Sequence, residues 1–416
     1  MTTPSQSRPI SPGIYADFSH LFSGGATAFV EIPNGPPRNL EAEYWPSIDE
    51  TPEKLEEMKE TFTFTTLPPY DPDHPDEWPV TEAILMGDME EALLAFPGFP
   101  TSFEPPPKKH EVRPIPGIGY GMFATEDIAV GDLIIRERPL VILTPIAPVV
   151  APRLVLVERL TDENREAFFA LHNCKGPDLD PVIGIINTNA VHATLPGFKG
   201  PCAAVCKEIS RANHSCSPNA LFSWDIASFS ESLHAIWPIA KGEQIYVCYG
   251  DQYAPRDTRR EFLLRRYKFH CKCYSCGLPD ADSRRSDTRR AILEKSTRQD
   301  AIDFAKTYSD TVVHKWLHDL SAPDDAVIKR CKALFKMMGD ERLLGYSLWL
   351  QYQRICAVYC ALGDAENARE WAQKAAAWSR SRYHDDCGWD AVARAPQNTA
   401  WWTLRVLLKK AMNMWP

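Results

Sequence analysis

The stretch Arg211–Asn219 reads Arg-Ala-Asn-His-Ser-Cys-Ser-Pro-Asn and gathers side chains that could do chemistry. It combines amides, an imidazole, hydroxyls and a thiol, and Pro218 prevents a helix at its own position. The apolar run Ala220–Phe222 follows directly, so we expect the polar stretch to lie against a core. Buried polar groups need defined hydrogen-bond partners. The stretch therefore predicts either a well-bonded turn or a binding site built on one.

A second group of reactive side chains has the spacing C-x-C-x-x-C, in Cys271, Cys273 and Cys276. Three thiols so spaced can face one point, but a structural zinc ion takes four ligands in a tetrahedron. Cys216 is the natural fourth ligand, so the sequence predicts a structural zinc site. Irregular spacing favours small buried residues over a second metal site for three further cysteines, Cys174, Cys202 and Cys206.

Three motifs taken together resemble the SET-domain lysine methyltransferases. They are the Asn-His-Ser-Cys-x-Pro-Asn stretch, a strand that ends in Tyr249-Gly250-Asp251, and the C-x-C-x-x-C motif. The likeness covers roughly residues 112 to 277 and is greatest to the SET-and-MYND subfamily and to fungal SET-domain proteins. No cysteine precedes Cys174, so the MYND zinc finger of the animal relatives, and the partner binding that it implies, are not expected.

The resemblance implies an α+β fold. It predicts a β-rich SET domain with a knotted active-site segment, a helical insertion and a zinc-bound flap, followed by an all-α domain of tetratricopeptide-like helical hairpins. The expected parts are a proline-rich, acidic and partly disordered region (1–109), the SET domain (110–277) with its insertion (145–205) and zinc motif (271–276), a basic linker (278–290) and a helical domain (291–416).

Local patterns predict individual elements. We expect helices over Pro52–Thr61, Val80–Phe96, Thr161 to near Asn173, and Arg256–Tyr267. We expect strands over Leu133–Ile135 and Leu140–Leu143. Two further strands, His234–Trp237 and Gln244–Tyr249, should pair with each other across a turn. In the helical domain, Gly363 can end one helix and Asp364 can cap the next. Ala368 and Ala375 then place small side chains at the helix crossing.

The resemblance also assigns roles to residues that match its motifs. Tyr249 and Tyr267 would line the channel for the target lysine and orient its amine. The zinc would pin the flap that carries Tyr267 and Phe269. The residues that would contact S-adenosylmethionine are Gly119, Tyr120, Gly121, Asn189, Asn213, His214 and Phe269. For Asn189 a polar cap between helices is an open alternative, and for Tyr249 and Phe269 the alternative is ordinary core packing.

The chemistry implied is methyl transfer to an amine of a protein substrate, histone or non-histone. A free lysine has a pKa near ~10.4, so at neutral pH almost all of it carries a proton. A narrow aromatic channel disfavours the ammonium ion by desolvation, and a neighbouring sulfonium acts in the same direction. An alternative stays open, in which the chain is an inactive SET-fold interaction protein that binds partners through its helical domain, because a fold does not define a function.

Composition limits the other possibilities. The chain has 416 residues, 44% of them hydrophobic, and 18 of its 35 prolines lie in residues 1–109. A net charge of −9 argues against general nucleic-acid binding. No apolar stretch approaches the ~20 residues of a membrane span, and the N-terminus has no signal pattern. We expect a monomer of the nucleus or cytoplasm with reduced thiols outside the zinc site, and Ser283–Arg290 as a solvated basic linker or a nuclear address.

Overall fold

A computed structural model describes residues 62–69, 79–101, 105–144, 150–177, 179–198, 200–307, 311–343, 346–383 and 385–413. They fall into two compact units. The first holds the described residues up to Gly250 together with Arg260–Cys271, and the second holds Asp251–Arg259 and the described residues from Lys272 onward. The helix predicted over Pro52–Thr61 lies outside the described residues.

The first unit contains a five-stranded sheet in the order β1-β2-β6-β8-β7. Its strands are β1 (Phe62–Leu67), β2 (Thr81–Met86), β6 (Val141–Leu143), β8 (Cys202–Val205) and β7 (Val191–Ala193). β2 and β6 run parallel, and the other neighbours are antiparallel. The helix predicted over Val80–Phe96 is wrong, because β2 comes first and only Met89–Leu94 (α4) is helical. Ala83, Ile84 and Leu85 are almost fully buried. A continuous apolar run shows no alternation of apolar and polar residues, so its sequence does not distinguish a strand from a helix.

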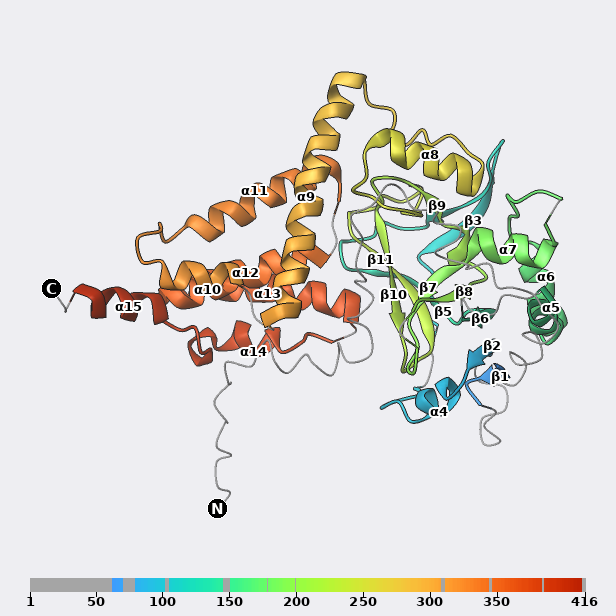
Figure 1. Ribbon diagram of the computed structural model, residues 1–416, viewed down its shortest axis with the longest axis horizontal. Helices are drawn as coiled ribbons and strands as arrows, with labels where there is room; N and C mark the ends of the chain where they lie inside the picture. The colour runs from blue at the N-terminus through green and yellow to red at the C-terminus, as the bar shows by residue number, and fades with distance from the viewer. Residues whose placement is uncertain are drawn as a thin grey trace, which may run out of the picture. The chain divides into compact units, whose positions relative to one another are not determined.

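Two smaller sheets carry the segments near the polar stretch. β5 (Leu133–Glu137) pairs with β11 (Ser230–Ala235), which pairs with β10 (Ala220–Asp225), and Figure 1 shows β10 and β11 side by side. β3 (His110–Ile115) and β4 (Gly119–Ala124) form a hairpin. The strands predicted over Leu133–Ile135 and Leu140–Leu143 are thereby confirmed.

The strand pair predicted between His234–Trp237 and Gln244–Tyr249 is wrong. The turn itself forms, since the Glu243 amide donates to the Ala240 carbonyl at 2.9 Å. Both arms nevertheless pair elsewhere: His234 and Ala235 belong to β11, which pairs with β10 and β5, and Gln244 bridges Phe123. The next strand, β12 (Tyr246–Val247), pairs in parallel with β9 (Asn213–His214).

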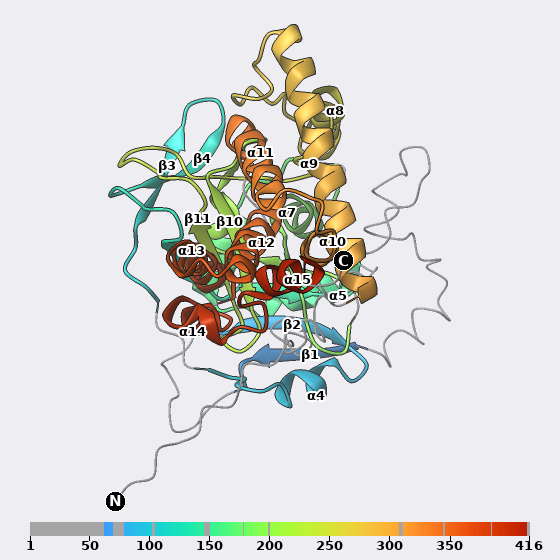
Figure 2. The ribbon, with the colours of Figure 1, turned by 90° about the vertical axis from the view of Figure 1, so that its left-hand side faces the viewer.

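Helices α5 (Val150–Glu158), α6 (Asp162–Phe169) and α7 (Pro181–Asn189) lie in the predicted insertion. Thr161 caps α6 as predicted, because its hydroxyl accepts a hydrogen bond from the Asn164 amide at 3.3 Å. The helix ends at Phe169, short of Asn173. Phe168 and Ile186 are fully buried and join a core with strands of the five-stranded sheet. Figure 2 shows β1 and β2 next to one another, with α4 close by.

The second unit is helical apart from its loops, in the part of the chain that is described. Its elements are the first turn of α8 (Arg256–Tyr267), α9 (Asp280–Thr307), α10 (Thr311–His318), α11 (Ala326–Glu341), α12 (Tyr346–Leu362), α13 (Ala365–Tyr383), α14 (Trp389–Arg394) and α15 (Leu404–Asn413). Gly363, with φ of +77°, ends α12, and the Asp364 carboxylate accepts the Asn367 amide at 3.1 Å at the start of α13. Ala368 and Ala375 are fully buried at this helical hairpin, as predicted.

The fold class is therefore α+β, as the sequence predicts. A tetratricopeptide-type identity of the α12–α13 hairpin stays a prediction. Among the described helices, none is long and apolar enough to cross a membrane.

The basic linker predicted over 278–290 is instead the beginning of α9. Two of its arginines, Arg289 and Arg290, form ion pairs within the protein, which composition alone does not show. Arg290 is fully buried, and its guanidinium donates to Glu341 at 2.9 Å, to the Ser275 hydroxyl at 2.9 Å and to the Gln252 carbonyl. The Ser286 hydroxyl adds a hydrogen bond to Glu341 at 2.5 Å.

This buried ion pair predicts a large loss of stability on removal of one partner. Glu341→Ala leaves the Arg290 charge buried without its carboxylate, and we expect a loss of about 3–5 kcal/mol in the free energy of unfolding. The control is Asp340→Ala at an exposed neighbour, whose ion pair with Lys336 is worth only about 0.3–0.5 kcal/mol. Denaturant unfolding of the two variants measures both effects, and equal losses would show that the buried pair is unimportant.

Candidate active site and cysteine cluster

The parallel pairing of β9 with β12 joins the polar stretch to the strand that leads to Tyr249. Asn213 lies opposite Tyr246, and His214 lies opposite Val247. The Ser215 amide donates to the Val247 carbonyl at 2.9 Å. Asn219 fixes the far end, since its side chain accepts the Tyr246 amide at 2.7 Å and donates to the Gln244 carbonyl at 2.9 Å. The sequence motifs at residues 213–219 and 246–250 are therefore one structural element.

His214 connects two parts of the site. Its Nδ1 accepts the backbone N–H of Tyr249 at 3.0 Å, and an amide can only donate. In the neutral ring, Nε2 therefore carries the proton and faces the Cys216 sulfur at 3.2 Å. The imidazole thus holds Tyr249 on one side and reaches the cysteine cluster on the other.

Tyr249 is held at both ends of its side chain. Its hydroxyl donates to the Ala212 carbonyl at 2.8 Å, and its ring lies 4.8 Å from the ring of Tyr267. Burial, followed by the nearby Tyr267 and Cys174, raises the pKa of Tyr249 well above its ordinary range. The phenol therefore stays protonated at physiological pH, and it can donate a hydrogen bond but cannot act as a base.

The glycine turn meets Asn213, whose side-chain amide donates to the Tyr120 carbonyl at 2.9 Å. A Cβ on Gly121 would lie 2.5 Å from the ends of the Gln244 and Ile115 side chains, which would have to move to make room for it. Gly119 has φ of +110°, and no atom of the described residues lies within 4 Å of where its Cβ would stand. The backbone there is strained for any other residue, and the space beside it is open.

Two more aromatic residues complete the group. The Phe269 ring lies 6.1 Å from the His214 ring. The Tyr120 side chain is half-exposed, and the Arg211 guanidinium lies 5.2 Å from its ring centroid. The residues brought together by these contacts are Tyr120, Gly121, Asn213, His214, Tyr249, Tyr267 and Phe269.

Asn189 behaves differently. It is buried, and its side-chain amide donates to the carbonyls of His172 at 2.7 Å and Ile185 at 2.8 Å, as in the polar-cap alternative. Two residues earlier, the side-chain oxygen of Asn187 is buried and has no hydrogen-bond partner in the described part of the chain. Sequence reasoning proposed Asn189, and not Asn187, as the candidate in this stretch. The sequence also did not mark Phe262. Its ring packs against the backbone just after Tyr249, since a Cβ on Gly250 would lie 2.6 Å from it.

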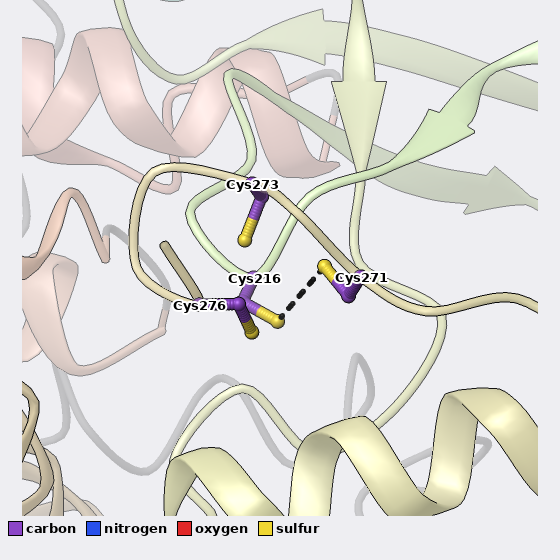
Figure 3. Close-up of side chains that lie close together, drawn as sticks. All are labelled: Cys216, Cys271, Cys273 and Cys276. Atoms are coloured by element: carbon purple, nitrogen blue, oxygen red, sulfur yellow. Dashed lines mark hydrogen bonds between the residues drawn. The ribbon is translucent and has the colours of Figure 1, made fainter. Parts of the chain in front are cut away.

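The four predicted cysteines form a compact cluster (Figure 3). Their sulfurs all lie within 4.8 Å of one another, and those of Cys216 and Cys271 are 4.0 Å apart. A tetrahedral ion with Zn–S bonds of ~2.3 Å separates its sulfurs by ~3.8 Å. Three of the four residues are buried, and none forms a disulfide. Number, separation and chemistry of the donors fit a metal ion held by four thiolates.

Glu137 binds the turn that leads into the polar stretch. The backbone N–H groups of Glu208 and Ile209 donate to its carboxylate at 2.9 and 2.5 Å, at the start of the 3-10 turn Ile209–Arg211 that leads to Asn213. Burial raises the pKa of Glu137 to about 7, although these backbone donors act in the opposite direction. Nothing in the sequence marks this residue, because its role arises only from the packing of β5 against the turn.

Comparison with known proteins identifies this region. Residues 119–250 match the family model for the SET domain. The match includes the glycine turn, Asn213, His214, Cys216 and Tyr249, and ends before Tyr267 and the C-x-C-x-x-C motif. The chain therefore contains a SET domain, as the sequence motifs predict.

The relatives share this part of the chain. A histone-lysine N-methyltransferase, set5, of Schizosaccharomyces pombe is 33% identical over 185 residues, which are 44% of this chain and 56% of that protein. The N-lysine methyltransferase SMYD2-B of Danio rerio is 31% identical over 105 residues, 25% of this chain and 24% of that protein. The chain thus spans little more than half the length of the first relative and a quarter of the second.

Among solved structures, the Neurospora SET domain protein DIM-5, a histone lysine methyltransferase, aligns with 17% identity and a TM-score of 0.18. The alignment covers 34% of this chain and 52% of that chain. The SET assignment rests on the family match and the relatives.

The raised pKa of Glu137 predicts a pH-dependent stability. The folded chain holds this proton more tightly than an unfolded chain, whose carboxyl has a pKa near 4.5. Its contribution is therefore fully present below pH 4.5 and is lost as the pH rises through about 7. The groups that face it are Glu208 (bonded to His110 and Lys108), Glu231 opposite it on β11, and Cys206.

We expect Glu137→Gln to remove about 1–3 kcal/mol of the change in unfolding free energy between pH 5 and pH 8. The variant eliminates this one titration and leaves the neighbouring carboxyls in place. The matched control is Glu111→Gln, at an exposed carboxyl of β3, which should keep the parent's pH dependence. Urea unfolding at both pH values provides the measurement. A Glu137→Gln variant with the parent's full pH dependence would contradict the assignment.

Proposed function

We propose that the chain transfers a methyl group from S-adenosylmethionine to a lysine amine of a protein substrate. The observation that carries the proposal is the arrangement around His214, which fixes Tyr249 against Tyr267 and lies beside Asn213 and Phe269. Two relatives are named as lysine methyltransferases, which supports methyl transfer to a lysine.

The residues present suit a cosubstrate with an adenosine and an amino-acid end. The turn at Gly119 leaves open space beside its backbone, and the Asn187 side-chain oxygen is a buried acceptor without a partner in the described residues. Asn213 and His214 would hold the cosubstrate on the polar side, with Phe269 packing against the adenine. When bound, S-adenosylmethionine supplies an electrophilic methyl group on a sulfonium.

The protein's own residues prepare the acceptor amine. Tyr249 and Tyr267 form an aromatic wall that disfavours a charged ammonium, so the lysine loses its proton to water before it reacts. Tyr249 itself is fixed by two hydrogen bonds and stays protonated, so it orients the amine rather than taking its proton. The residues would therefore raise the rate by aligning the amine and by removing water from it.

We further propose that the four-cysteine cluster holds zinc and that the metal is structural. All four positions of a tetrahedron are filled by thiolates, so no position remains for a substrate or water. The ion would link the Cys216 turn, which lies two residues after His214, to the loop of Cys273 and Cys276. It would thereby keep Tyr267 and Phe269, just before Cys271, in place over the site.

An interaction protein without activity is the weaker proposal. The aromatic pair and the His214 contact are both present, whereas an inactive descendant would be under no constraint to keep them. Partners of the helical domain, a monomeric state and a nuclear or cytoplasmic location remain expectations from the sequence.

Tyr249→Phe should lower turnover on the order of 10²-fold, because it removes a fixed hydroxyl and keeps the ring. The affinity for S-adenosylmethionine should change little, because other residues contact it. The matched control is Tyr246→Phe on β12, whose hydroxyl bonds the Gln244 side chain instead. Methylation of cell-extract proteins and calorimetric binding measure the two effects, and undiminished turnover in Tyr249→Phe would place the acceptor site elsewhere.

Cys273→Ser should release the metal and weaken S-adenosylmethionine binding together, because both depend on the same loop. Elemental analysis should find about one zinc ion per parent chain and a much smaller amount in the variant. Cys202→Ser, at a buried thiol outside the cluster, should keep the metal. A parent chain that lacks zinc would end the metal proposal without affecting that of methyl transfer.

A further inference from the structure

The loop before α7 brings one of the chain's own lysines to the aromatic pair. The Lys175 amine lies 5.9 Å from the ring centroid of Tyr267 and donates a hydrogen bond to the Arg266 carbonyl at 2.6 Å. The Tyr267 ring is itself 4.8 Å from that of Tyr249. All of these residues belong to the same compact unit.

The lysine is positioned by the loop rather than by chance. Its backbone amide donates to the Asn173 side chain at 2.9 Å. The adjacent Cys174 is fixed to Thr188 of α7, through its amide at 3.2 Å and its sulfur at 3.3 Å. The Cys174 sulfur also contacts the Arg266 carbonyl, at 3.7 Å. Two consecutive side chains therefore converge on the carbonyl that precedes Tyr267.

These contacts are the ones that a methyl-accepting lysine needs. A carbonyl oxygen orients the amine through one of its N–H groups, and the aromatic wall beside it desolvates the amine, as proposed for a substrate lysine. The Lys175 side chain is half-buried, so its amine is partly shielded from water. By comparison, Lys268 follows Tyr267 directly in the sequence, but its side chain is exposed.

We propose that Lys175 is a site of self-methylation, in which the chain methylates its own lysine within one molecule. This inference rests on the proposed function of the same site. In the reaction the ammonium first gives a proton to water. The nitrogen lone pair then forms the N–CH₃ bond while the S–CH₃ bond breaks, and the sulfonium becomes a neutral thioether.

The geometry also limits the product. A monomethylated or dimethylated ammonium keeps an N–H for the Arg266 carbonyl, whereas a trimethylated one has none. We therefore expect Lys175 to carry one or two methyl groups.

The test incubates the full chain with methyl-labelled S-adenosylmethionine and maps the label by mass spectrometry of its peptides. We expect label on the peptide with Lys175 and a loss of at least ~10-fold in Lys175→Arg, because arginine keeps the charge and the donor but is not an acceptor for this chemistry. Lys268→Arg is the matched control and should keep the label. The labelled fraction per unit time should not depend on protein concentration, because the reaction is intramolecular.

The outcomes separate this inference from the proposed function. Labelled extract proteins with an unmodified Lys175 would overturn self-methylation and leave the proposed function standing. Label at another lysine, or a rate per chain that rises with protein concentration, would also overturn it. Label in neither the chain nor the extract would remove the proposed function, and the inference with it.

Discussion

The hydrogen bond from the Tyr249 amide to His214 Nδ1 is the contact on which the site depends. It is possible only because two-residue strands β9 and β12 run side by side, which places residues far apart in sequence in register. The His214 ring positions the backbone at Tyr249. The same hydrogen bond selects the tautomer with the proton on Nε2, which faces the Cys216 sulfur. Tyr249 and the cysteine cluster are thereby coupled through a single imidazole.

Buried charge supports this arrangement in each unit. In the first unit the Glu137 carboxylate binds the turn that precedes Asn213, at the cost of a pKa raised to about 7. In the second unit the buried Arg290 binds the hydroxyl of Ser275, which lies between two cluster cysteines, and the carbonyl of Gln252, three residues after Tyr249. Buried ion pairs add little net stability, but they specify geometry when every partner is present. In this chain the Arg290–Glu341 pair fixes the positions of Ser275 and Gln252.

Sequence predicted the parts of the site whose residue types are unusual. The polar stretch, the C-x-C-x-x-C motif and the Tyr-Gly-Asp strand end were recognisable, and the cysteines indeed cluster. Predictions failed where a pattern has more than one structural solution. The buried run at 83–85 could be helix or strand, and the arms around the 240–243 turn found other partners. Arg289 and Arg290 of the expected linker lie in α9 and pair with Glu341 of α11. Glu137 gave no signal, because its hydrogen bonds to the turn arise from contacts between distant segments.

The central claim is that His214 joins a cosubstrate site to Tyr249, and calorimetric titration of S-adenosylmethionine tests it most directly. The parent chain should bind at a single saturable site, and His214→Ala should weaken binding by at least ~10-fold, about 1.4 kcal/mol. The metal content of both proteins, measured in the same samples, separates loss of the imidazole from loss of the cysteine cluster. Absence of binding by the metal-loaded parent, or equal affinity in a metal-loaded His214→Ala variant, would contradict the account.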